Sequence, residues 1–168
     1  MGSFLSLPIL LIAAALQATF VPQIRLLGGG PELVFLLVLA WSINADLEEG
    51  VVWAFAGGIM QDLLSATPTG TSTLSMLLIV FAISGLGQQV YRIGIMVLIG
   101  LVLFGSLMQQ IITMLILALN GFPIDWLTNL TYVSAPTIFY NLVFIWPVYW
   151  FVRRLQRRLT RDSRFYVD

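Results

Sequence analysis

The chain has 168 residues, of which 59% are hydrophobic and 10% charged, and its formal net charge is zero. This composition is far more apolar than that of a soluble domain and indicates a membrane protein. Cysteine, histidine and lysine are absent, which excludes disulfides, thiolate or imidazole metal sites, P-loop chemistry and Schiff bases. We therefore expect no cofactor and no metal. The length suits a single transmembrane helical bundle over residues 1–152 with an arginine-rich cytoplasmic tail over residues 153–168.

Hydrophobic segments separated by turns and charged stretches predict an all-α fold. The first segment, from Phe4 to Val21, lacks a basic start and a small-residue cleavage site, so we expect a retained helix and not a signal peptide. The remaining segments are expected over residues 32–43, 51–64, 74–86, 93–119 and 132–152. A spanning helix needs about 20 residues, which the second and third segments do not reach as apolar runs. We predict a six-transmembrane-helix bundle, with five spans as the alternative.

The arginines predict the orientation of the bundle. Most of them follow Val152, and the excess of positive charge in cytoplasmic segments places that tail inside the cell. An even number of spans then puts the N-terminus in the cytoplasm as well. Trp41 and Trp53 are expected at the cytoplasmic interface of the membrane. The arginines expected to set topology and to attract anionic lipids are Arg153, Arg154, Arg157 and Arg158.

Asp62 lies in the apolar segment that ends at Leu64, where an ionised carboxylate near the bilayer centre would cost about 3 kcal/mol or more. Steps of four residues back from it reach Gly58, Ala54 and Gly50, a stripe of small residues on one helix face. We expect this stripe to pack within the bundle, with a homo-oligomer contact as the alternative. For Asp62 three interpretations stay open: hydrogen bonding to the following loop, contact with a partner in a pocket, or a proton or ion relay.

Polar residues of different helices fall at similar depth in the outer half of the predicted bundle. Lipid contact would be costly for them, so we predict that they line an outward-facing pocket. The predicted pocket residues are Gln17, Asp62, Gln109, Gln110 and Asn141. The predicted rim residues are Glu32, Thr67, Pro68, Thr69 and Gly70.

The stretch GGIMQDLLSATPTG, from Gly57 to Gly70, resembles the signature of the MreD family of bacterial rod shape-determining membrane proteins. The stretches Leu16–Pro22 and Pro31–Leu33 are similar to the opening of that family, although the family more often has Pro-Asp where this chain has Pro31-Glu32. The resemblance implies a multi-pass protein of the bacterial inner membrane. It also implies a fold similar to the substrate-binding subunits of energy-coupling-factor transporters.

The same resemblance implies a non-enzymatic scaffold of the cell-elongation complex that supports peptidoglycan synthesis. Its expected partner is MreC, whose membrane-proximal segment would occupy the pocket. RodA, its transpeptidase and MreB filaments are further expected partners, and nucleic acid is not. The alternative function is that of a small-molecule-binding subunit of a vitamin-type transporter. An intramembrane aspartyl protease would need two facing acids, and Asp62 alone is placed for that role.

Overall fold

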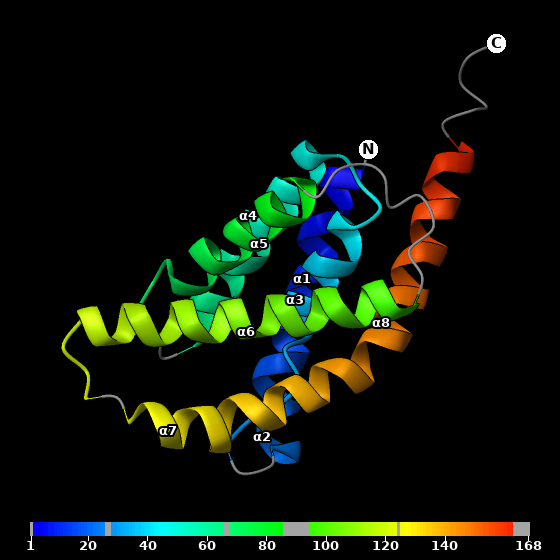
Figure 1. Cartoon of the computed structure of the whole chain (residues 1–168). Helices are drawn as coiled ribbons and strands as arrows, with labels where there is room; N and C mark the ends of the chain where they lie inside the picture. The colour runs from blue at the N-terminus through cyan, green and yellow to red at the C-terminus, as the bar shows by residue number, and fades with distance from the viewer. Residues whose placement is uncertain (1, 26–27, 66–67, 86–94, 124, 163–168) are drawn as a thin grey trace.

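The computed structural model describes residues 2–25, 28–65, 68–85, 95–123 and 125–162. Every regular element in these ranges is a helix, as Figure 1 shows. The elements are α1 (Gly2–Thr19), α2 (Val21–Ile24), α3 (Leu33–Ser42), α4 (Leu47–Leu64), α5 (Thr71–Gly85), α6 (Ile95–Leu119), α7 (Trp126–Asn129), the π-helical η1 (Leu130–Ser134) and α8 (Ala135–Asp162). A helix therefore occupies each of the predicted hydrophobic segments.

By length and apolar composition, two helices in the described ranges could cross a membrane, Ile95–Leu119 and Trp126–Arg158. The second of these is a continuous helical stretch through α7, η1 and α8, and it bends along α8, as Figure 1 shows. Ser6–Thr19, Leu33–Ser42 and Thr71–Gly85 are apolar but shorter. The length of the helices alone thus does not support six spans, and that number stays a prediction.

Two helix boundaries differ from the sequence-based expectation. The residues Glu48 and Glu49, expected in a turn, lie in the first turn of α4, where the helix dipole favours negative charge. The last helix does not stop at Val152 but continues to Asp162. Arginine, leucine and glutamine form helices readily, so the arginine-rich segment extends the helix instead of ending it.

Helix α3 is the centre of the bundle. Each of its residues from Val34 to Trp41 is buried, and it packs against α1, α4 and α8. With 10 residues it is about 15 Å long, about half the thickness of a hydrocarbon core of roughly 30 Å. The surrounding helices extend past its N-terminus, so the middle of the bundle is filled by a helix over only part of its depth.

The place of Trp41 and Trp53 at the depth of the cytoplasmic interface stays a prediction, but both side chains are buried inside the bundle. Their exposures are 1% and 0%, and their rings stack with centroids 4.0 Å apart at an interplanar angle of 14°. The two indoles come from α3 and α4, and burial of their large apolar surfaces against each other joins these helices.

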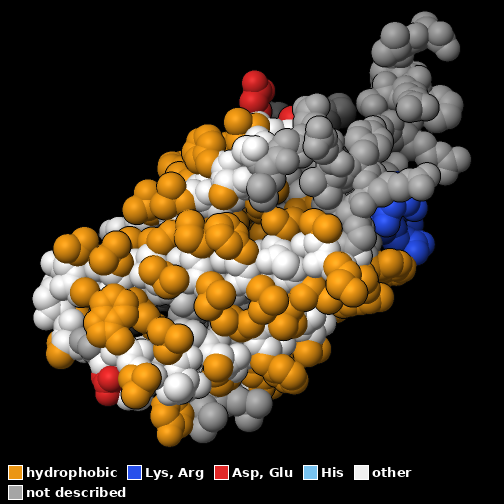
Figure 2. Space-filling view, in the orientation of Figure 1, with side chains coloured by type: hydrophobic (Ala, Val, Ile, Leu, Met, Phe, Trp, Pro, Cys, Tyr) orange, Lys and Arg blue, Asp and Glu red, His pale blue; other side chains and the backbone are white. Residues whose placement is uncertain are grey.

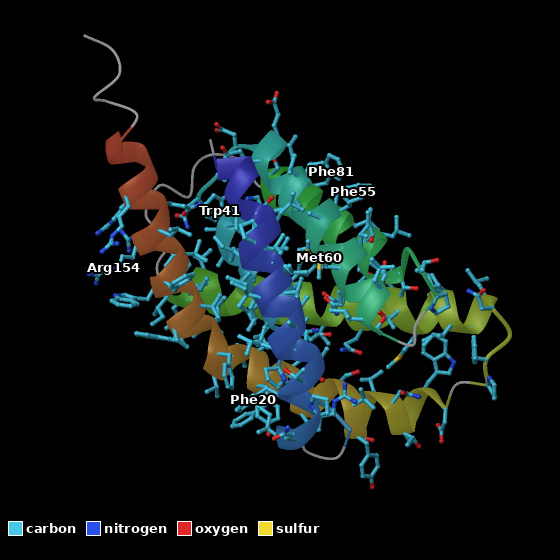
Figure 3. The ribbon with its side chains drawn as sticks, turned by 180° about the vertical axis from the view of Figure 1, so that it is seen from behind. Phe20, Trp41, Phe55, Met60, Phe81 and Arg154 are labelled. Carbon is cyan, nitrogen blue, oxygen red and sulfur yellow. The ribbon has the colours of Figure 1, made fainter. Side chains whose placement is uncertain are left out.

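The outer surface is rich in hydrophobic side chains, which are spread across the described part of the face seen in Figure 2. Phe55 and Phe81 point outward from α4 and α5 in Figure 3 and are about half exposed. An apolar surface of this extent is unusual for a soluble monomer and is typical of contact with lipid.

In Figure 1 the start of α1 and the end of α8 lie toward the same end of the molecule, while residues 68–70 and 120–123 lie toward the other.

Candidate functional site

A cavity of about 470 Å³ lies beside the N-terminus of α3. Its walls come from α1, α2, α4, α5, α6, η1, the first turn of α8 and the loop before α3, and it occupies the region that the short α3 does not fill. The polar residues that line it are Gln17, Arg25, Glu32, Gln61, Ser65, Ser72, Gln109, Gln110, Thr113 and Thr137. Such a polar lining inside an apolar bundle is the feature expected of a binding site.

The carboxyl group of Glu32 accepts hydrogen bonds from side-chain amides of α6 and α8. Gln109 Nε2 donates to Glu32 Oε1 at 3.2 Å, and Gln110 Nε2 lies 3.5 Å from the same oxygen. Asn141 Nδ2 donates to Glu32 Oε2 at 3.1 Å and to Ser106 Oγ at 3.0 Å. Asn141 and Gln109 are 0% and 2% exposed, so the polar groups that surround the carboxyl group of Glu32 form a buried network.

The N-terminus of α3 is capped by side chains of other helices. The backbone N–H of Glu32 donates to Asn141 Oδ1 at 3.0 Å, and the N–H of Val34 donates to Gln17 Oε1 at 3.0 Å. The first N–H groups of a helix lack intrahelical partners, and the side chain of Glu32, at the N-cap position, does not supply one. The carboxamides of α1 and α8 therefore fix where α3 begins.

Asp62 is buried and caps α5 from the end of the preceding helix. Its carboxylate accepts from the N–H groups of Gly70 at 2.8 Å, Ser72 at 2.9 Å and Thr73 at 3.3 Å, and from Thr73 Oγ1 at 2.9 Å. Gly70 has φ +97, a conformation that glycine adopts without strain. Of the three interpretations of Asp62, these contacts are of the kind expected for hydrogen bonding to the following loop. They explain why negative charge is tolerated at the end of α4.

The structure brings some of the predicted pocket residues together and separates others. Gln17, Glu32, Gln109 and Gln110 line the cavity. Asn141 lies behind Glu32 and is fully buried. The predicted residues that do not belong to the lining are Asp62, Pro68, Thr69 and Gly70. Thr67 lies outside the described residues.

Sequence reasoning missed Gln61, Arg25 and Thr137 as lining residues. Gln61 carried a usable signal, since it is an amide in an otherwise apolar helix beside Asp62. Successive residues point about 100° apart on a helix, so a helix face that turns Asp62 toward α5 leaves Gln61 facing another neighbour. Arg25 and Thr137 carried no such signal.

The predicted small-residue stripe lies inside the bundle. A Cβ atom on Gly58 would collide with the backbone of Thr73 in α5, and one on Gly50 would lie 3.1 Å from Ser42 Oγ and from Val80 Cγ1. Ala54 is fully buried. The geometry is that of an intramolecular contact in which two backbones approach closely.

The arginines of the last described turns lie far from the cavity. Arg153, Arg154, Arg157 and Arg158, together with Trp150, surround a surface hollow of about 540 Å³. The guanidinium carbon of Arg154 lies 5.2 Å from the centre of the Trp150 ring, a cation–π contact. Figure 3 shows Arg154 pointing away from the bundle.

Comparison with known proteins gives one match. The sequence model of the family described as rod shape-determining protein MreD matches residues 1–159. No curated protein and no solved structure matches the chain. The regular elements of the described residues are all helices, and the expected likeness to energy-coupling-factor subunits stays a prediction.

Proposed function

The chain belongs to the MreD family of rod shape-determining membrane proteins, and on this premise we propose that it is a non-enzymatic scaffold of the cell-elongation complex. It binds MreC through the cavity beside α3, and in doing so supports peptidoglycan synthesis in the bacterial inner membrane. Rod shape determination is the role of the family. The proposal adds the site and the mode of action.

The observation that carries this proposal is the cavity itself. Its floor is held by a buried network that joins Glu32 to α6 and α8, so the site is present before any partner arrives. A pre-formed site loses little conformational freedom on binding. A volume of about 470 Å³ suits a few anchoring side chains from a docked segment, with apolar contacts giving affinity and the polar lining giving register.

The arrangement of the helix ends supports an outward-facing site. The start of α1 and the arginine-bearing end of α8 lie toward one end of the molecule, and the arginines favour the cytoplasm for that end. The cavity lies beside the N-terminus of α3, away from those arginines, and thus faces the periplasm. The proposal includes six spans, both termini in the cytoplasm, and a bundle like that of energy-coupling-factor substrate-binding subunits.

The proposed occupant is the membrane-proximal segment of MreC. RodA, its transpeptidase and MreB filaments are further proposed associates, and anionic lipids are proposed at the arginines of α8. One observation favours the alternative of a transporter subunit: the volume of about 470 Å³ falls in the range of small-molecule pockets, roughly 300–1,000 Å³. Co-purification of a transporter module in place of MreC would decide for that alternative.

A cavity-blocking variant tests the proposal. Ala18 and Thr113 both line the cavity, and neither belongs to the Glu32 network, so Ala18→Trp with Thr113→Trp fills the site while leaving the network in place. Ala15→Trp with Ile111→Trp is the matched control, because these residues lie on the same helices but outside the lining.

The measurements are co-purification of MreC and restoration of rod shape in cells that lack the native protein. We expect the blocking pair to lose both and the control pair to keep both. A stably folded blocking pair that still binds MreC and restores shape would rule out the cavity as the binding site.

A further inference from the structure

Glu32 presents a carboxylate to the cavity without a cationic partner. Both of its oxygens accept hydrogen bonds from neutral amides, those of Gln109, Gln110 and Asn141. In the described part of the chain no hydrogen bond joins Glu32 to an arginine. A buried charge that lacks an opposite charge is costly, and a binding partner that supplies one is favoured.

Two side chains that line the cavity each carry a buried oxygen without a partner among the described residues. Gln109 Oε1 is buried without a hydrogen-bond donor in the described part of the chain, and since Gln109 Nε2 is committed to Glu32, the free atom is an acceptor. Gln61 Oε1 is likewise buried and unpartnered among the described residues. Side chains that carry such acceptors, from the N-cap position of α3 and from α4 and α6, thus line one cavity.

We propose that this cavity selects a cationic, hydrogen-bond-donating side chain, an arginine or a lysine, of the segment that docks there. The inference rests on the proposed function for the existence of a docked segment, and adds the chemistry that the site recognises. A guanidinium or ammonium group supplies positive charge and donors only, which matches the Glu32 carboxyl group, bonded to neutral amides, and lining side chains whose unpaired atoms are acceptors. An acidic or purely apolar anchor would leave them unpaired.

The chain's own Arg25 is the competing source of positive charge. It also lines the cavity, but its side chain is exposed. Although Arg25 lies in the same cavity, no donor in the described part of the chain bonds to the buried Oε1 atoms of Gln61 and Gln109. The partner is therefore the better source of a donor. A variant without Arg25 distinguishes between Arg25 and the partner as the source of the positive charge.

The experiment measures binding of MreC from the same genome to the protein in nanodiscs. Glu32→Lys should weaken binding by at least about tenfold, since it places a like charge against the incoming cation. Gln61→Glu should strengthen binding by about threefold or more, and raise its sensitivity to salt, because a second carboxylate then faces the cation. Arg25→Ala should strengthen binding, because it removes from the cavity lining a charge of the same sign as the incoming cation.

Charge exchange provides the specific readout. Each arginine or lysine in the membrane-proximal segment of MreC is changed to glutamate, and one of these changes should restore binding to Glu32→Lys. Gln61→Glu leaves the contacts of Glu32 in place. It therefore tests whether the cavity selects a cation even where Glu32→Lys does not fold. Unchanged binding in Gln61→Glu, or loss of binding in Arg25→Ala, overturns the inference.

These outcomes are distinguishable from failure of the proposed function. If the Ala18→Trp and Thr113→Trp pair abolishes binding while Gln61→Glu and the charge exchange have no effect, the cavity binds MreC but does not select a cation. If the blocking pair binds MreC normally, the cavity is not the binding site of MreC, and the proposed function is overturned independently of the cation.

Discussion

Glu32 and Asn141, separated by 109 residues, hold each other through two reciprocal hydrogen bonds. The backbone N–H of Glu32 donates to Asn141 Oδ1, and Asn141 Nδ2 donates back to the carboxyl group of Glu32. Because Asn141 also binds Ser106, one side chain joins the start of α3 to α8 and α6. The relative position of these helices, and thus the shape of the cavity, depends on it.

Replacing Asn141 with leucine should lower the free energy of unfolding by about 1–3 kcal/mol, because the N–H of Glu32, its carboxyl group and Ser106 each lose a buried partner. Thermal unfolding in detergent micelles measures the change. Asn120→Leu is the control, since Asn120 is exposed and bonds only to the carbonyl of its own helix. Equal stability of the two variants would show that the network does not hold the bundle.

Replacing Asp62 with alanine should loosen the start of α5 and cost about 1–2 kcal/mol, the typical range for loss of a helix cap. Hydrogen exchange at residues 70–73 should accelerate, because Asp62 accepts from three of these amides. Binding of MreC should fall less than in the cavity-blocking pair. A loss of binding without faster exchange would instead give Asp62 a direct contact with the partner.

Adding a methyl group at Gly58 should destabilise the bundle by about 1–3 kcal/mol through overpacking, because α5 lies against it. The matched control is Gly100→Ala in α6, where a Cβ atom has no neighbour within 4 Å and the change should stabilise the helix by about 0.5–1 kcal/mol. Melting temperatures of the two variants should therefore move in opposite directions. A stable Gly58→Ala variant would contradict the close contact of α4 and α5.

Changing Arg153, Arg154, Arg157 and Arg158 together to glutamine should weaken binding to anionic vesicles by about 1 kcal/mol per arginine close to the surface. It should also produce a fraction of molecules with inverted topology. Vesicle flotation and reporter activity measure the two effects, with Arg25→Gln as the control. If both are unchanged, the arginines act through a protein partner.

Reporter fusions before Phe4 and after Arg164 should both report the cytoplasm. This follows from an even number of spans together with the arginines at the end of α8. A fusion at residue 122, in the loop after α6, should report the periplasm and serves as the internal contrast. Termini on opposite sides would require an odd number of spans.

The positions of the helices could be predicted because apolar runs end at glycine, proline or charged residues. The environment of each helix was harder to predict, because an apolar side chain suits lipid and protein interior equally. For that reason the burial of Trp41 and Trp53 inside the bundle was not predicted. Within the site, depth in the membrane predicted Gln17 and Gln109, but the sequence offered no means of pairing Glu32 with a residue as distant as Asn141. It also could not show that Asp62 turns toward the N-terminus of α5.

The stacking of Trp41 on Trp53 gives the molecule an optical signature. Two indoles with ring centroids 4.0 Å apart share their electronic excitations, which produces a paired circular-dichroism band and a perturbed fluorescence spectrum. Both rings lie at the opposite end of α3 from Glu32. A spectrum that keeps the paired band while the cavity is altered by substitution or by a partner identifies a change confined to the outer half, and loss of the band reports that α3 and α4 have separated.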